Sequence, residues 1–165
     1  MTNNDPSVRR RRSSRSERGA VAGLEGVMLG VLVLVAGTVL VAHAWSVVQT
    51  RRTLDGAARE YLRSYTEADD PDAASAAGRR ALDDVLNGEG SRRVDVVTRL
   101  PDPATFGPCA RSTVSLSAVV PGVHLPFVGD LASTTVEVTH SELVDAHREM
   151  TSGRAYDIEG TPCGG

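Results

Sequence analysis

The chain has 165 residues, a net charge of −3 and 4% aromatic residues. This length leaves room for one small domain with a modest core once a membrane segment is set aside, so a large multidomain enzyme is excluded. The scarcity of aromatic rings argues against a surface that stacks carbohydrate or single-stranded nucleic acid.

The first 19 residues form a basic leader. They contain six arginines against only Asp5 and Glu17, whereas the remaining sequence carries more acidic than basic residues. A basic run can serve as a nucleic-acid arm, but its position directly before an apolar stretch favours a role in membrane topology. We therefore expect residues 1–19 to be a disordered cytoplasmic leader, with no nucleic acid as partner.

A long apolar run follows the leader. Residues 26–42 contain no ionisable group, and ten of these 17 residues are Leu or Val. About 20 such residues span a bilayer, so we predict a transmembrane helix over residues 20–48, with Trp45 at the interface. Six arginines precede the run and only Arg51 and Arg52 follow it closely. This asymmetry places the N-terminus in the cytoplasm and the rest of the chain outside the cell membrane.

A cleaved secretory signal is the competing interpretation, because Ala42-His43-Ala44 fits the small-x-small pattern of signal peptidase. The apolar run is longer than an ordinary signal, however, and a helical pattern continues beyond it. Over residues 49–68 an apolar stripe recurs every three or four residues, at Leu54, Ala57, Ala58, Tyr61, Leu62 and Tyr65. We expect one helix from about Ala22 to Ala68, amphipathic from residue 49 onward.

Residues 69–165 are predicted to form an extracytoplasmic α+β domain with a flexible C-terminal tail. Asp70 and Pro71 are typical of a helix start and Asn87-Gly88 of a helix end, which predicts a short helix over residues 72–86. We expect its buried residues to be Ala77, Ala81, Leu82 and Val85.

Beyond residue 90 the apolar period changes to two. Val94, Val96 and Leu100 alternate with Arg93, Asp95 and Arg99; the same alternation follows over Arg111–Val120 and Ser133–His140. The fold class is therefore α+β: a long N-terminal transmembrane and amphipathic helix, then a short helix and a small antiparallel β-sheet with one face against the helices.

Cys109 and Cys163 are the only cysteines, and both fall on the side predicted to be external, where disulfides persist. A bond between them would stabilise the fold by roughly 4 kcal/mol through loop-closure entropy. The alternative is two unpaired thiols.

An acidic residue stands at the threshold of the apolar run, in the segment Arg18-Gly19-Ala20-Val21-Ala22-Gly23-Leu24-Glu25. A basic leader, a Gly, small residues, a Glu and a long apolar helix are similar to the N-terminus of type IV pilins. With Ala57-Ala58-Arg59-Glu60 further on, the chain resembles the TadE-like proteins, minor pilins or pseudopilins of the tight-adherence (Flp) pilus system. The order of Cys109, a Thr/Ser/Val strand, Leu125-Pro126-Phe127 and a second strand is also similar to that family's outer domain.

The resemblance implies that a prepilin peptidase cuts after Gly19 and that Glu25 meets the new N-terminal amine of a neighbouring subunit, which sets subunit register. Glu25 would then be the sixth mature residue, where pilins favour the fifth; a cut after Ala20 restores that spacing and loses the Gly. Taken alone, Glu25 is a carboxylate at a helix start, stabilised by the helix dipole and nearby Arg18.

Three glycines of the apolar run, Gly26, Gly30 and Gly37, form a small-residue face suited to close helix packing. The implied partners are membrane lipid, other pilins or pseudopilins and the tight-adherence platform proteins. All 18 basic residues are Arg, which is typical of GC-rich genomes such as those of actinobacteria.

The sequence contains no recognisable catalytic constellation. Its four histidines show no metal-ligand spacing, and we expect His140 to be a surface residue near a strand end and His147 a surface residue on a following helix. We therefore expect no enzyme, no cofactor, no metal and no small-molecule substrate. The rival to a pilus component is a stand-alone membrane-anchored binding module, in which Glu25 serves only as a helix-start carboxylate.

Overall fold

The computed structural model describes residues 15–88, 95–125, 129–130 and 132–164. The leader up to residue 14, the predicted strand residues Arg93 and Val94, the Pro126-Phe127 pair and Gly165 lie outside these ranges. The chain divides into an N-terminal unit, residues 1–41, and a second unit, residues 42–165, which we call the head. Each is described separately.

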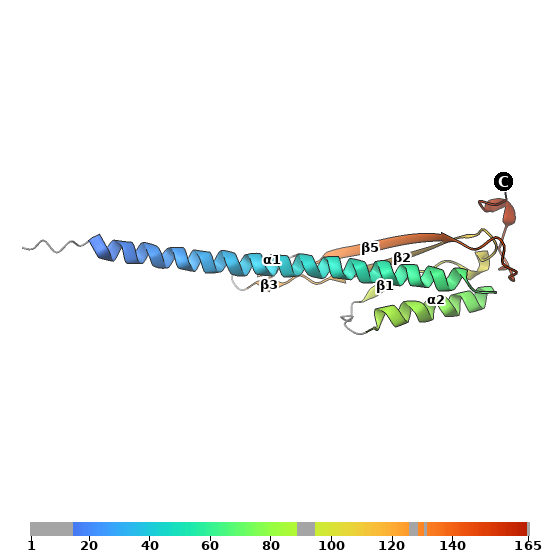
Figure 1. Ribbon diagram of the computed structural model, residues 1–165, viewed down its shortest axis with the longest axis horizontal. Helices are drawn as coiled ribbons and strands as arrows, with labels where there is room; N and C mark the ends of the chain where they lie inside the picture. Colours follow the sequence, from blue (N-terminus) through green and yellow to red (C-terminus); the bar gives the residue numbers. More distant parts are fainter. Residues whose placement is uncertain (1–14, 89–94, 126–128, 131, 165) are drawn as a thin grey trace, which may run out of the picture. The chain divides into compact units, whose positions relative to one another are not determined.

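A single helix, α1, runs from Arg15 to Thr66 (Figure 1). It was expected to extend from about Ala22 to Ala68, and the one-helix prediction is confirmed with an earlier start and a slightly earlier end. The helix continues without interruption through Ala42-His43-Ala44 and Arg51. Its apolar first part lies in the N-terminal unit, and its last part, from Ala42 onward, belongs to the head.

The second helix, α2, spans Pro71–Leu86 and lies alongside the end of α1 (Figure 1). The carboxylate of Asp70 accepts a hydrogen bond from the N–H of Ala73, Pro71 occupies the first turn, and Asn87 caps the C-terminus. The sequence-based start and stop signals are therefore confirmed.

The face that α2 buries differs from the predicted one. Ala74, Gly78 and Leu82 are buried, whereas Ala77, Ala81 and Val85 are half-buried. Of the four residues expected to be buried, only Leu82 is. The physical reason is the ring of Tyr61 on α1, which approaches α2 so closely that only a glycine leaves room: a Cβ on Gly78 would lie 2.8 Å from Cε2 of Tyr61.

The predicted antiparallel sheet is present, with three strands in the order β1-β2-β5. Strand β1 spans Val96–Arg99, β2 spans Arg111–Val120 and β5 spans Thr134–Leu143. β2 pairs with β5 along its whole length, from Arg111 opposite Leu143 to Val120 opposite Thr134. A separate short hairpin pairs β3, His124–Leu125, with β4, Gly129–Asp130. The described residues of the head also include two short 3-10 turns, η1 (Pro103–Thr105) and η2 (Ile158–Gly160).

The two faces of the sheet differ as the period-two alternation predicts. The inner face of β2 and β5 contributes the buried side chains Val114, Leu116, Ala118, Val120, Val136 and Val138. On the outer face hydroxyl groups pair across the strands: Thr113 Oγ1 lies 2.8 Å from Ser141 Oγ, and Ser115 Oγ lies 2.9 Å from Thr139 Oγ1. Such pairs stabilise a wet sheet surface, so β-branched and hydroxyl residues are well suited to these strands.

One hydrophobic core joins the sheet to both helices. In Figure 1, β5 lies on one side of α1 and α2 lies on the other. The predicted stripe of α1 supplies the central core residues: Leu54, Ala57, Ala58, Tyr61, Leu62 and Tyr65 are all buried. The ring of Tyr65 stacks with Tyr61 at a centroid distance of 5.7 Å and meets Phe106 edge-on at 5.4 Å. The head is therefore assembled around the end of α1.

Candidate membrane anchor and its junction with the head

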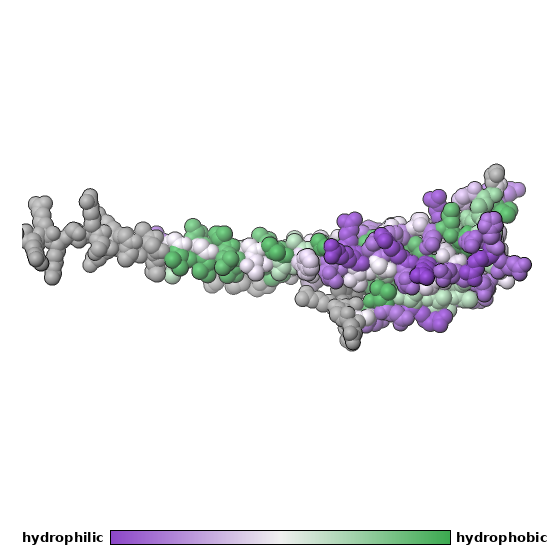
Figure 2. Space-filling view, in the orientation of Figure 1, coloured by the Kyte–Doolittle hydropathy of each residue, from purple (hydrophilic) through white to green (hydrophobic). Residues whose placement is uncertain are grey.

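Most of the apolar part of α1 is left uncovered by the described part of the chain. Among the described residues, α1 is the one helix long and apolar enough to span a membrane, with a mean hydropathy of 2.4 in its most apolar window and none of that window buried. Large apolar side chains are exposed all around the helix, including Val27, Met28, Leu32, Leu34 and Val41. Figure 2 shows this segment as mostly hydrophobic and the visible face of the head as mostly hydrophilic. An exposed apolar surface of this kind requires another covering, such as lipid.

The structure places the predicted assembly residues at the start of this apolar segment. Gly19 and Ala20 lie in the helical backbone of α1. Glu25 is exposed, and no ion pair or hydrogen bond reaches it from any side chain that the structure describes. A Cβ added to Gly26, Gly30 or Gly37 would meet no heavy atom of the described chain within 4 Å. The packing of this chain on itself therefore does not require glycine at these three positions.

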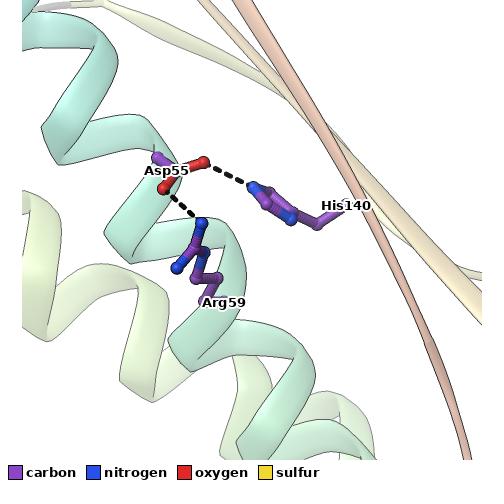
Figure 3. A network of polar contacts seen from close by, with 3 residues as sticks. All are labelled: Asp55, Arg59 and His140. Carbon is purple, nitrogen blue, oxygen red and sulfur yellow. Dashed lines mark hydrogen bonds and ion pairs between the residues drawn. The ribbon is translucent and has the colours of Figure 1, made fainter.

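Three polar side chains, two on α1 and one on β5, form a junction between α1 and the sheet (Figure 3). Asp55 Oδ1 lies 2.6 Å from Nε2 of His140 on β5, and Asp55 Oδ2 lies 3.0 Å from Nη2 of Arg59 one turn along α1. The hydrogen bond from His140 lowers the pKa of Asp55 below its usual value, and the charges of Arg59, His140 and Arg51 lower it further, against partial desolvation.

Sequence reasoning missed this junction. His140 was expected to be a plain surface residue, but its side chain is only 27% exposed and is held by Asp55, 85 residues away in the sequence. His147 was expected on a following helix, and the residues after β5 instead form a turn in which Asp145 accepts a hydrogen bond from the N–H of His147. The available signal was the position of His140, which continues the inward-facing alternation of Val136 and Val138.

The predicted disulfide is present: Cys109 and Cys163 are bonded. Cys109 is buried and Cys163 is exposed. Cys109 also has a left-handed backbone, with a φ of 59°. It is the third residue of the turn Gly107-Pro108-Cys109-Ala110, in which the N–H of Ala110 donates to the carbonyl of Gly107 at 3.0 Å. A proline followed by a residue with positive φ is the pattern of a type II turn.

Cys109 and Ala110 both face Val144 across the end of the sheet. The N–H of Cys109 donates to the carbonyl of Val144, and the N–H of Val144 donates to the carbonyl of Ala110, each at 3.0 Å. Two residues opposite one, the first with positive φ, define a G1-type bulge, where glycine is usual. The sequence therefore uses cysteine at a glycine position because the side chain is needed for the disulfide.

The C-terminal segment is fastened to the turn region by more than the disulfide. The N–H groups of Gly153 and Ala155 donate to the carbonyls of Phe106 and Ala104 at 2.7 and 2.8 Å. The hydroxyl of Tyr156 donates to the carbonyl of Pro108 at 2.7 Å. The segment that leads into the predicted flexible tail, Thr161–Gly165, is thus held by defined hydrogen bonds and contains the 3-10 turn η2.

One polar atom of the core lacks an ordinary partner. The hydroxyl of Tyr65 is buried and makes no hydrogen bond of normal geometry with the described residues. Burial, with smaller contributions from the neighbouring Tyr61 and Asp102 and against the nearby Ser112 hydroxyl, raises the pKa of Tyr65 to about 12. The side chain packs between two other rings, which indicates a structural role.

The described surface of the head has shallow, open depressions. One lies between α1 and α2 and is lined by residues that include Glu60, Ala77 and Arg80. Another surrounds the helix caps Asp70 and Asp102. The acidic residues there take part in local structure. The carboxylates of Asp70 and Asp102 accept backbone hydrogen bonds, and Asp69 Oδ1 pairs with Arg148 Nη2 at 2.8 Å. Neither depression brings together a nucleophile, a base and an orienting group.

Comparison with known proteins identifies no relative: no protein-family model, no curated protein and no solved structure matches this chain.

Proposed function

We propose that this chain is a TadE-like minor pilin or pseudopilin, a structural component of a tight-adherence pilus or a related secretion assembly. The observation that carries the proposal is the uncovered apolar segment of α1, which begins at Glu25 and leads into a helix that forms the centre of a folded head. Such a segment loses its contact with water in a bilayer or in a bundle of similar helices. The role is non-enzymatic and uses no cofactor.

Glu25 supports an assembly role over a plain anchor. A carboxylate at the edge of an apolar helix is costly to bury unless a cation meets it. Within this chain, no described side chain supplies that cation. The N-terminal ammonium of a neighbouring subunit, created by prepilin peptidase cleavage after Gly19 or Ala20, would supply it and would fix the axial register of the two helices.

Charge and redox chemistry support the proposed orientation. The arginine-rich leader favours a cytoplasmic N-terminus, which places the head outside the cytoplasm. The disulfide between Cys109 and Cys163 is consistent with an oxidising compartment on that side. The partners are then membrane lipid, other pilins or pseudopilins and the platform proteins of the secretion system.

The N-terminal mass of the protein isolated from membranes tests the processing step. We expect a mature N-terminus at Ala20 or Val21. Retention of Met1 or Thr2 would favour a stand-alone membrane-anchored module instead, and an end at Trp45 would mean a secreted soluble product, which would overturn the proposal.

A substitution at Glu25 tests the register role. We expect Glu25→Leu to leave membrane insertion intact and to reduce recovery of the chain with the other pilins. Glu60 is also exposed and also lies on α1, so Glu60→Leu is the matched control that removes the same charge from the head. Equal recovery of both variants and the unmodified chain would rule out the pairing role of Glu25.

A further inference from the structure

The first charged residues after the apolar segment are Arg51 and Arg52, and both are exposed. Between Glu25 and Asp55 the sequence contains no acidic residue. These two arginines therefore stand at the end of an apolar helix segment without an acidic neighbour on its apolar side.

The arginine side chains that the structure describes on α1 divide into two groups. Further along the helix, Arg59 Nη2 pairs with Asp55 at 3.0 Å and Arg63 Nε pairs with Glu67 at 3.3 Å, each across one helical turn. Arg51 and Arg52 form no ion pair with any described residue. The acidic residue nearest to them in the sequence, Asp55, has both carboxylate oxygens engaged, one by His140 and the other by Arg59. Two guanidinium groups consequently remain available to an external anion.

The surface beside these cations is apolar and exposed. Trp45 is 64% exposed and Val48 is 42% exposed. Residues 45, 48 and 52 follow each other at spacings of three and four, so Trp45, Val48 and Arg52 share one stripe of the helix. Arg51 lies one residue round from this stripe and closer to Asp55, whose pKa it helps to lower. This order suits the boundary of a bilayer, because an aromatic ring and an apolar residue can lie near the hydrocarbon while the cations that follow reach the phospholipid headgroups.

We propose that Arg51 and Arg52 form a binding site for the phosphates of anionic phospholipid headgroups, at the leaflet where α1 leaves the membrane. This inference rests on the proposed membrane anchoring and adds to it a preferred lipid class. The guanidinium forks donate to phosphate oxygens, while the paired Arg59 and Arg63 remain with their acidic partners. Binding at this depth fixes how far α1 rises from the bilayer.

Trp45 allows a local test, because it is the only tryptophan of the chain. The full chain is reconstituted in vesicles of phosphatidylcholine and phosphatidylglycerol in equal parts. Energy transfer from Trp45 to dansyl-labelled phosphatidylglycerol is compared with transfer to dansyl-labelled phosphatidylcholine, which gives the relative association of the two lipids beside this residue. The leader arginines lie at the other end of the apolar run in the sequence, so they contribute little to this signal.

We expect phosphatidylglycerol to be enriched around Trp45. In the double variant Arg51→Gln with Arg52→Gln, the loss of each arginine should lower this enrichment by about fivefold. The double variant Arg79→Gln with Arg80→Gln on α2 removes the same charge from exposed positions of the head and should leave the enrichment unchanged. Potassium phosphate and potassium chloride at matched ionic strength should weaken it equally, by screening.

Three outcomes would overturn the site. Enrichment that survives loss of both arginines, or that falls equally in the α2 variant, would show that no local site exists. A larger loss in phosphate than in chloride would mean that the arginines bind free phosphate. Absence of energy transfer to either labelled lipid would instead overturn the membrane anchoring itself, so failure of this inference is distinguishable from failure of the proposed function.

Discussion

At the scale of single residues, the contact between Asp55 and His140 ties the helix that enters the head to the long edge strand. The 2.6 Å contact joins residues that are 85 positions apart, so it forms only when β5 has docked on α1. Asp55 is 37% exposed and Arg59 is 68% exposed. Solvent therefore screens the ion pair between Asp55 and Arg59. This ion pair contributes more to the geometry of the junction than to the folding free energy.

The depressed pKa of Asp55 predicts a specific response to acid. Because the folded-state pKa lies below the unfolded value of about 3.9, the carboxylate stabilises the fold fully above that value, and this contribution is lost as the pH falls through the folded pKa. We expect Asp55→Asn to lower the unfolding free energy at neutral pH, and the difference from the unmodified chain to shrink below about pH 4.

Urea unfolding of the detergent-solubilised chain across this pH range measures the effect. Asp83 is exposed on α2, and none of its side-chain atoms takes part in a described ion pair or hydrogen bond. Asp83→Asn should therefore change the unfolding free energy little at any pH. A constant difference between Asp55→Asn and the unmodified chain down to about pH 3 would contradict the proposed linkage.

At the scale of elements, the contact between α1 and α2 depends on a missing side chain. Gly78 is buried against Tyr61, which is 1% exposed and cannot retreat without disturbing its stack with Tyr65. Gly56 lies on the exposed side of α1. A Cβ added there would have no heavy atom of the described residues within 4 Å. The same substitution should have opposite consequences at the two glycines.

We expect Gly78→Ala to destabilise the head by about 1 to 2 kcal/mol, because overpacking against the ring outweighs a helix-propensity gain of about 1 kcal/mol. Gly56→Ala should stabilise it by about 0.5 to 1 kcal/mol, since only the propensity gain applies. The midpoints of urea unfolding give the comparison. Stabilisation by both substitutions would show that α2 can shift away from Tyr61 at little cost.

The elements themselves could largely be predicted from local chemistry. The period of two over β2 and β5 and the stripe of α1 identified the inward-facing residues, because one face of each element must leave water. For α2 this logic identified Leu82 but missed the other buried residues. Ala77, Ala81 and Val85 look more apolar than Ala74 and Gly78, yet Ala74 and Gly78 are the ones buried beside Leu82. A hydrophobic pattern does not mark Gly78 as buried, because glycine has no side chain. Gly78 is buried because the ring of Tyr61 needs the space that a side chain would fill.

The polar junction could not be predicted for a different reason. The partner of His140 is set by how β5 lies on α1, and no local pattern in either segment encodes that arrangement. The same holds for the backbone of Cys109: the Gly-Pro-Cys-Ala turn could be suspected from Pro108, but its bulge depends on Val144 across the sheet. Contacts between distant segments need the folded arrangement, whereas periodicity needs only the neighbours in sequence.

At the scale of the whole molecule, the disulfide closes the head by joining the start of β2 to the C-terminal segment over 54 residues. Loop-closure entropy gives a stabilisation of about 4 kcal/mol for a loop of this length. Cys109 also has a φ of 59°, a conformation that costs a non-glycine residue roughly 1 kcal/mol. The disulfide therefore stabilises the head while holding a residue that is unfavourable at its position.

Two double variants separate these effects. Cys109→Ala with Cys163→Ala should lower the unfolding free energy by about 4 kcal/mol, since the cross-link is lost and the backbone strain remains. Cys109→Gly with Cys163→Ala should recover about 1 kcal/mol of that loss, because glycine adopts a positive φ readily. Urea unfolding under oxidising conditions measures both. Equal stability of the two variants would mean that the turn relaxes to a negative φ once the bond is absent, and the G1-type bulge opposite Val144 would then depend on the disulfide.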